Sequence, residues 1–261
     1  KLRQWLEQPL MDKEEIQKRL DAVEFLKKDL IKIESLKEQL KYIKDIQRLS
    51  TKIAYASINP RECLMLKTSL EVLPAVRNLV KTTGIMLLDE CYDNIDPLKD
   101  VCDLLDASIV ENPPANMKDG GVIKGTYDEK LSELYDIMEN GKSIIDTLEK
   151  AEREQTGIKT LKIKYNRVFG YFIEVTKSNL DMVPYRYNRK QTLANNERYI
   201  TEELKDLEDK ILGAKEKSIQ LEQDIFNDIK NALKSQIKRL QKSAEYISVL
   251  DSLVSLAIVA N

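Results

Sequence analysis

The last sixty residues of the chain carry apolar residues at spacings of three and four, and this repeat limits the fold more than any other feature. The apolar positions are Ile200, Leu204, Leu207, Ile211, Ala214, Leu221 and Ile225 and then, after a shift of register, Ile229, Leu233, Ile237, Leu240, Ile247 and Leu250. This spacing predicts helix. Sixty helical residues would extend about 90 Å, and such a helix needs a partner that covers its apolar stripe.

A second helical repeat supplies that partner. Leu131, Leu134, Met138, Ile145 and Leu148 mark one face of a helix expected over about 128–154, which would run back along the first half of the long helix. The first third of the chain also predicts helices. Asp12 with Glu15, and Asn59 with Pro60 and Glu62, have the spacing of capping boxes at helix starts.

Composition excludes several classes of site. The chain has 261 residues and no histidine, which rules out a Ser-His-Asp triad, a Cys-His pair and a His-ligated zinc within it. Its three cysteines form no CxxC pair, so we expect a reduced, cytoplasmic chain. No apolar run reaches the roughly 18 residues of a membrane span, and no signal peptide is visible. Because the chain opens with Lys1 and stops within an apolar pattern, we interpret it as a piece of a longer protein.

The segment 157–200 differs from the rest. It contains nine Lys and Arg and three Asp and Glu, a net charge of +6, whereas the remaining residues sum to 33 − 41 = −8. Seven of the sixteen aromatic residues also lie here. The string LKIKYNRVFGYFIEVTK alternates apolar and polar residues, which predicts two strands with a bend near Asn166 or Gly170. We therefore expect a mainly α fold whose long antiparallel helices carry a small, basic, β-rich insertion.

The string RKQTLANN within this segment is rich in hydrogen-bond donors. Arg189 and Lys190 supply charge, and Gln191, Thr192 and Asn195 supply neutral donors, all of which phosphate oxygens accept. If the last helix began near Asn195 or Asn196, its free N–H groups would add a second anion site. The alternative is a polar loop with a helix cap. The surrounding charge favours phosphate contact without base reading, because the sequence predicts no recognition helix.

Other candidate sites have weaker support. The aromatics could stack on bases, but their alternation favours a small core. The chain has no GxxxxGK[ST] phosphate loop. The acidic cluster Asp89, Glu90, Asp93 and Asp96 does not have the spacing of a calcium loop. Cys63, Cys91 and Cys102 lie in apolar patterns typical of core residues. We therefore predict no catalytic residue and no metal site.

Long motifs also resemble a known family. The strings TGIKTLKIKYNRVFGYFIEVTK and VPYRYNRKQTLANNERYITEEL resemble the clamp of MutS-type DNA mismatch-repair proteins, here of a bacterial kind. LRQWLEQPL, NPREC, DGGVIKGTYDEKL and LDSLVSLAIVA extend the resemblance over the whole chain. The resemblance implies a helical core and lever at 1–156 and 201–261, with the clamp at 157–200 inserted between two lever helices.

The resemblance also implies a function. In such proteins two copies form a homodimer whose clamps close around double-stranded DNA. A mismatch-reading domain precedes the region and an ABC-type ATPase follows it, so ATP and Mg²⁺ would be bound outside this fragment. The fragment itself would need no cofactor, catalyse no reaction and transmit a signal along the lever. The expected location is the bacterial cytoplasm, in association with the nucleoid.

The family's contacts to the DNA backbone fall, by resemblance, on the RKQTLANN string. The candidates are Lys190, Gln191 and Asn195, with Arg189 and Thr192 beside them, and, on the neighbouring strand positions and the bend, Lys162, Lys164 and Arg167. Alternation predicts that Lys162 and Lys164 lie on the exposed face of their strand. A different class stays open, namely a structural coiled-coil adaptor whose basic tip meets an acidic protein or RNA.

Overall fold

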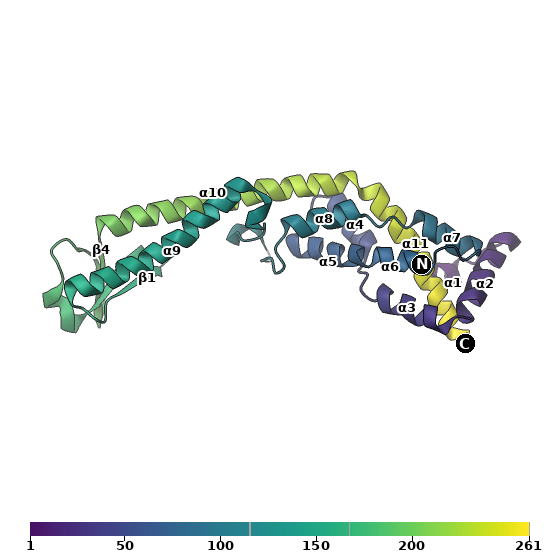
Figure 1. Ribbon diagram of the computed structural model, residues 1–261, viewed down its shortest axis with the longest axis horizontal. Coiled ribbons are helices and arrows are strands. Elements are labelled where there is room, and N and C mark those ends of the chain that lie inside the picture. The colour runs from purple at the N-terminus through teal and green to yellow at the C-terminus, as the bar shows by residue number, and fades with distance from the viewer. Residues whose placement is uncertain (115, 167, 261) are drawn as a thin grey trace. The chain divides into compact units, whose positions relative to one another are not determined.

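The computed structural model describes residues 1–114, 116–166 and 168–260 (Figure 1). Contacts divide the chain into two compact units, here called unit 1 (Lys1–Lys124 with Gln223–Asn261) and unit 2 (Gly125–Glu222). Helix α10 (Glu202–Ser235) supplies residues to both units. The division into 1–156, 157–200 and 201–261 follows expected roles rather than contacts, and it stays a prediction.

Unit 1 is helical. It contains α1 (Leu2–Glu7), α2 (Lys13–Lys27), α3 (Leu30–Leu40), α4 (Ile46–Ala54), α5 (Pro60–Glu71), α6 (Leu73–Leu79), α7 (Met86–Asn94), α8 (Lys99–Ser108), the 3₁₀ turn η1 (Met117–Asp119), the end of α10 and α11 (Ile237–Val259). Helix α11 packs against α1, α2, α3, α4 and α7 (Figure 1). It buries Leu240, Leu250 and Leu253 completely, so the end of the long apolar repeat forms the centre of this core.

Local capping signals place two of these helices. The Asn59 side chain accepts from the backbone N of Glu62, and the Glu62 carboxylate accepts from the backbone N of Asn59, which confirms the predicted capping box with Pro60 in the first turn. At α2 the Asp12 side chain accepts from the backbone N of Glu15, as predicted. The Glu15 carboxylate instead accepts from Lys18 Nζ at 2.5 Å.

The predicted sixty-residue helix is interrupted. Helix α10 ends at Ser235 and α11 begins at Ile237, with Gln236 between them at φ −98° and ψ 3°. The interruption lies beyond the register shift of the apolar repeat, which falls between Ile225 and Ile229. Arg239 fixes the first turn of α11, because its Nε donates to Asp96 Oδ2 at 2.7 Å and one terminal nitrogen donates to Asp100 Oδ2 at 2.7 Å. Partners distant in sequence thus anchor the start of α11.

Unit 2 begins with the 3₁₀ turn η2 (Gly125–Tyr127) and pairs α9 (Glu129–Thr156) with the first part of α10. Contacts run in opposite sequence order along the pair. The hydroxyl of Tyr135 donates to Glu222 Oε1 at 2.9 Å, and the Gly141 backbone faces Ile211 further along α9. The predicted antiparallel pairing of these helices is therefore confirmed. Gly157 ends α9 in the left-handed region, with φ 71°.

A four-stranded antiparallel sheet follows α9. Its strands are β1 (Lys162–Asn166), β2 (Gly170–Thr176), β3 (Asn188–Thr192) and β4 (Asn196–Ile200), with the 3₁₀ segment η3 (Lys177–Met182) between β2 and β3. The order across the sheet is β1-β2-β4-β3. The fold is thus mainly α with a small inserted sheet, as predicted, and the bend between β1 and β2 lies where alternation places it.

The condition for a second anion site at the start of the last helix is not met. Asn195 and Asn196 do not open the last helix, since β4 occupies Asn196–Ile200 and α10 begins at Glu202. The Thr201 hydroxyl oxygen accepts from the backbone N of Leu204 at 3.2 Å and caps the helix instead. The β-alternation of this stretch buries Tyr199 beside Ile173 of β2, and this pairing outweighs the helical signal. The anion site expected at a helix N-terminus near Asn195 is therefore absent from the described structure.

Candidate nucleic-acid interface

The two faces of the sheet have different chemistry. One face, here called the core face, packs Leu161, Ile173, Val175 and Tyr199 against Leu148 of α9 and Leu204 of α10. Because side chains alternate along a strand, the opposite face, here called the outer face, carries the intervening residues. The sequence pattern therefore buries the apolar set and turns Lys162 and Lys164 outward, as predicted.

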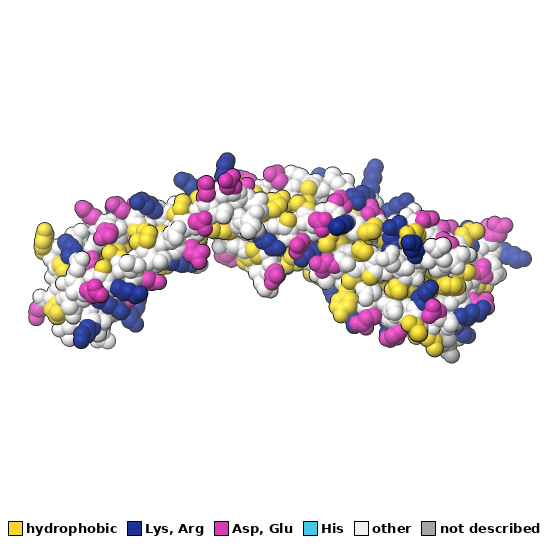
Figure 2. Space-filling view, in the orientation of Figure 1, with side chains coloured by type: hydrophobic (Ala, Val, Ile, Leu, Met, Phe, Trp, Pro, Cys, Tyr) yellow, Lys and Arg dark blue, Asp and Glu magenta, His cyan; other side chains and the backbone are white. Residues whose placement is uncertain are grey.

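The hairpin of β3 and β4 presents most of the predicted phosphate-binding residues. Arg189, Lys190, Thr192 and Asn195 are exposed, and Gln191 is half-buried. A hydrogen bond from the backbone N of Leu193 to the carbonyl of Asn196, at 2.9 Å, closes the turn. Figure 2 shows Lys and Arg side chains gathered beside the sheet, at the left of the view. The outward cationic surface that phosphate contact requires is thus present.

A bulge distributes these residues between the two faces. The register passes from Arg189 opposite Tyr199 directly to Gln191 opposite Arg198, so Lys190 is the extra residue of β3. Arg189 and Thr192 therefore lie on the side of Tyr199, and Gln191 lies on the side of Arg198. Lys190 is exposed and forms no ion pair with any residue that the structure describes. It is the least compensated cation of the hairpin.

Arg189 is less free than its exposure suggests. Its terminal nitrogen lies 3.7 Å from Glu197 Oε1, and the Thr192 hydroxyl lies 3.5 Å from the same oxygen. Glu197 is buried and also accepts from the Tyr199 hydroxyl at 2.5 Å. The Glu197 carboxylate therefore holds two of the predicted contact residues on the core face. Sequence reasoning missed this residue because its role depends on the β3–β4 register.

The strand lysines belong to the far edge of the sheet. Lys162 and Lys164 lie on β1, three strand spacings from β3, which is about 14 Å at the usual separation of strands. Lys164 Nζ is paired with Glu174 Oε1 at 2.6 Å, whereas Lys162 has no ion pair within the described ranges. The structure thus groups residues 189–195 on one hairpin and separates the strand lysines from them. Arg167 lies outside the described residues.

Comparison with known proteins adds the decisive observation to this geometry. The sequence profile described as MutS domain III matches residues 1–257, which is nearly the whole chain. The chain belongs to the MutS domain III family. The predicted resemblance to MutS-type proteins is therefore confirmed.

Curated relatives agree with the family assignment. The chain is 49% identical over 259 residues to the DNA mismatch repair protein MutS of Caldanaerobacter subterraneus subsp. tengcongensis, covering 99% of the chain and 30% of that protein. It is 49% identical over 260 residues to the MutS of Alkaliphilus oremlandii (100% and 30%) and 51% identical over 265 residues to that of Bacillus cytotoxicus (99% and 29%). The chain thus spans about 30% of the length of these relatives.

The seven aromatics of residues 157–200 in this MutS domain III chain differ in burial. Phe172, Tyr187 and Tyr199 are buried, and the rings of Tyr187 and Tyr199 lie 5.8 Å apart, so the core interpretation holds for them. Tyr171 is half-buried. The exposed members are Tyr165, Phe169 and Tyr185. Phe172 lies on the outer face, where the Arg198 guanidinium covers its ring at 4.3 Å, so this ring is not free to stack on a base.

Three tyrosines of unit 2 each donate to a glutamate, and this arrangement predicts instability in alkali. The donors are Tyr135, Tyr187 and Tyr199, and the acceptors are Glu222, Glu152 and Glu197. Burial, followed by the hydrogen bond to the carboxylate, raises the pKa of all three hydroxyls, that of Tyr199 to about 12.

Because these folded-state pKa values exceed the ordinary value near ~10, the unfolded chain loses the protons first as the pH rises. The stabilisation is complete below pH ~10 and is lost as the pH rises through the folded pKa values. We expect unfolding free energies measured by urea titration to fall between about pH 10 and 12, with a shallower fall in Tyr199→Phe. The fully exposed Tyr185 gives the control, since Tyr185→Phe should leave the pH profile unchanged.

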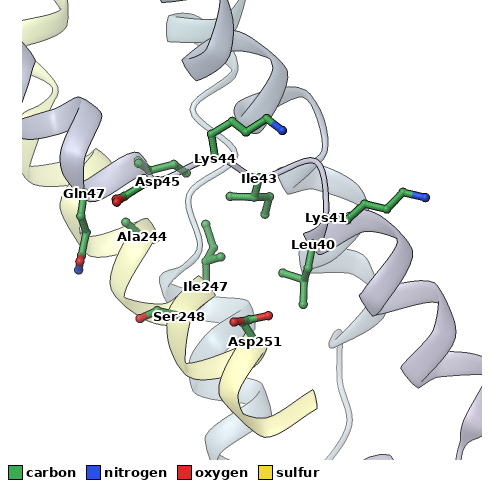
Figure 3. Close-up of a pocket in the computed structure, with 11 residues that line it drawn as sticks. Leu40, Lys41, Ile43, Lys44, Asp45, Gln47, Ala244, Ile247, Ser248 and Asp251 are labelled. Carbon is green, nitrogen blue, oxygen red and sulfur yellow. The ribbon is translucent and has the colours of Figure 1, made fainter. Parts of the chain in front are cut away.

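Clefts in unit 1 of the MutS domain III chain do not assemble a second site. A cleft of about 400 Å³ lies between the α3–α4 connection and α11, and Figure 3 shows Lys41 and Lys44 extending away from Ile247 and Asp251. Asp45 is occupied as the cap of α4, because its side chain accepts from the backbone N of Arg48 at 2.9 Å. The charged residues of this cleft therefore do not converge on one point.

The remaining candidate groups of unit 1 have structural partners. Asp89 accepts from the backbone N of Thr83 at 2.9 Å, and Asp96 pairs with Arg239. Within the described residues no group of three or more His, Cys, Asp or Glu could hold a metal ion. Cys63 and Cys91 are buried core residues, as predicted, whereas Cys102 is only half-buried. Burial raises the pKa of the Cys63 and Cys91 thiols to about 12. None of the helices described is both long enough and apolar enough to span a membrane.

Proposed function

We propose that unit 2 contacts the backbone of double-stranded DNA through the β3–β4 hairpin, as the clamp of a mismatch-repair protein. The observation that carries the proposal is the exposed hairpin with Arg189, Lys190, Gln191, Thr192 and Asn195, of which Lys190 lies on a bulge and has no ion pair among the residues described. The charge of +6 over residues 157–200 supports it. The similarity to DNA mismatch repair proteins MutS supports the same proposal.

The proposed contact is independent of sequence. Phosphate contacts position a protein on DNA but carry no base information. Lys162 and Lys164 would extend the contact along the outer face, at the far edge of the sheet. One copy that meets about two to four phosphates gives a log–log salt dependence with a slope of roughly −2 to −4. We therefore expect weak binding that is equal on matched and mismatched duplexes.

The long helices would carry a signal between the DNA and other parts of a complete MutS protein. Helix α10 supplies residues to both units, which supports a lever role for it. We further propose that the complete protein is a homodimer with a clamp from each copy around the duplex, in the bacterial cytoplasm at the nucleoid. ATP and Mg²⁺ would be bound outside this chain, whose sequence contains no GxxxxGK[ST] loop. The proposal gives the chain no catalytic step.

Charge reversal at Lys190 tests the DNA contact. We expect Lys190→Glu to weaken binding of a duplex about tenfold and to reduce the magnitude of the salt slope by about one, because one phosphate contact with its counterion release is lost. Fluorescence anisotropy on matched and mismatched duplexes at several salt concentrations measures both quantities. Lys159→Glu is the matched control, since Lys159 is an exposed lysine of the same basic segment outside the hairpin.

Either of two results would contradict the clamp proposal. Equal losses in Lys190→Glu and Lys159→Glu would mean that only the net charge matters. Unchanged duplex binding in Lys190→Glu and in Arg189→Glu would favour the adaptor class, in which the basic tip meets an acidic protein or RNA.

A further inference from the structure

Arg198 connects three strands on the outer face of the sheet. Its guanidinium lies 4.3 Å from the centre of the Phe172 ring on β2, and its Nε lies 3.9 Å from Glu174 Oε2 on the same strand. One terminal nitrogen donates to the side-chain oxygen of Gln191 on β3 at 2.9 Å. The side chain is 19% exposed. Arg198 belongs to β4 and is held by its contacts with Phe172 and Glu174 of β2. It also bonds Gln191, a residue of the proposed DNA contact.

The chemistry of this hydrogen bond fixes the orientation of the Gln191 amide. A guanidinium has five donors and no acceptor, so Gln191 must turn its carbonyl oxygen toward Arg198. Its NH₂ group is then directed away from Arg198. No residue in the described part of the chain accepts a hydrogen bond from this NH₂. Arg198 thus leaves a neutral donor of known orientation available to a phosphate oxygen.

The position of the Arg198 guanidinium reduces stability, and this loss also indicates that Arg198 positions Gln191. Nε of Arg198 is buried and has no hydrogen-bond partner among the described residues. Buried donors without partners are rare in native structures and reduce stability. An arginine that served only to neutralise Glu174 would do so best with Nε bonded to the carboxylate. The observed geometry gives up that bond and keeps the one to Gln191.

We propose that Arg198 is a positioning residue for DNA-backbone binding, which holds the Gln191 amide so that its NH₂ donates to a phosphate oxygen. This inference rests on the proposed clamp function. The inference goes beyond the clamp function because it assigns a role to Arg198, whose side chain is largely covered. It also names the Gln191 NH₂ group as the donor of that contact.

A double-mutant cycle on the full 261-residue chain tests the assignment. Arg198→Lys keeps the charge but loses the planar set of donors, and Gln191→Ala removes the oriented amide. We expect each to weaken duplex binding about fivefold, as for loss of one hydrogen bond, and the double variant to be no weaker than either single one. The salt slope should stay unchanged in all three, because no charge is removed and a neutral donor releases no counterion.

Arg186 offers a matched control. It also pairs with a glutamate, Glu152, and also donates to a glutamine oxygen, Oε1 of Gln155, at 3.0 Å. These contacts lie outside the β3–β4 hairpin. Arg186→Lys should therefore leave duplex binding unchanged, although it removes the same kinds of contact as Arg198→Lys.

The outcomes separate this inference from the function on which it rests. Additive losses in the double variant would overturn the role of Arg198, because they would mean that it acts independently of Gln191. Circular dichroism at the titration temperature verifies that each variant is folded. If Arg198→Lys does not fold, Arg198→Met, which keeps the stem on Phe172 but removes the charge, takes its place in the cycle, and the coupling is then read from the affinities alone. A Lys190→Glu variant that binds as tightly as the unmodified chain would overturn the clamp function as well.

Discussion

Replacing Gly141 with leucine is expected to lower the free energy of unfolding of unit 2 by about 3 kcal/mol, since overpacking a close helix contact costs this much. Even a Cβ atom at Gly141 would lie 2.4 Å from Cγ1 and 2.6 Å from Cδ1 of Ile211. Helices α9 and α10 therefore approach each other at this point because residue 141 has no side chain. The gain in helix propensity, about 0.8 kcal/mol for leaving glycine, is too small to compensate.

Gly213 is the matched control for this substitution. It lies in α10 of the same unit, and a Cβ atom built there would meet nothing within 4 Å. Gly213→Leu should raise the stability by about 0.5–1 kcal/mol through helix propensity. Urea unfolding monitored by hydrogen exchange in peptides from residues 125–222 measures both effects. A Gly141→Leu variant as stable as Gly213→Leu would mean that the two helices separate without cost.

A compensating change identifies the contact. The loss of stability caused by Gly141→Ala should be smaller in an Ile211→Ala background than with Ile211 present, because the smaller side chain removes the overlap. If the lever role is correct, this seam is the part of unit 2 that must stay closed for the helices to act as one element. Additive effects of the two substitutions would show instead that the Ile211 side chain moves aside without loss of stability.

Local signals in the sequence predicted those elements whose determinants are close along the chain. The Asn59–Glu62 capping box and the hairpin of β1 and β2 depend on residues a few positions apart, and the structure confirms both. The interruption at Gln236 contains no glycine or proline. Arg239 fixes the start of α11 through Asp96 and Asp100, which lie more than a hundred residues away. A local sequence pattern therefore does not predict the interruption.

The proposed site shows the same limit. The charge and donors of residues 189–195 were visible in the sequence, but β3 and β4 were not, because NRKQT carries no apolar alternation. Tyr199 lies opposite Ile173 where β4 pairs with β2, and the bulge at Lys190 sets the register of β3 on β4. Only this register shows that the Glu197 carboxylate contacts Arg189 and Thr192, and that Arg198 donates a hydrogen bond to Gln191. The residues of the proposed contact could thus be named from the sequence, whereas the contacts that orient them required the sheet.

Replacing Glu152 with alanine should have an effect as large as that of Gly141→Leu. Glu152 lies near the end of α9, is 4% exposed, and accepts from the Tyr187 hydroxyl at 2.7 Å and from an Arg186 nitrogen at 2.5 Å. Tyr187 directly precedes β3 and is 6% exposed. The variant leaves this buried hydroxyl without its acceptor and Arg186 without its carboxylate, for which we expect a loss of about 3 kcal/mol.

Two further variants separate the buried hydrogen bonds from the loss of a charge on α9. Glu154 is an exposed glutamate on the same helix, and Glu154→Ala should change the stability by less than about 0.5 kcal/mol. Glu152→Gln retains an acceptor for Tyr187 but not the ion pair, so its loss should fall between the two. Urea unfolding gives all three values. A Glu152→Ala variant as stable as Glu154→Ala would mean that the Glu152 contacts do not fasten the start of β3 to α9. The clamp hairpin would then depend on the apolar contacts of Tyr199, Ile173 and Leu204 alone.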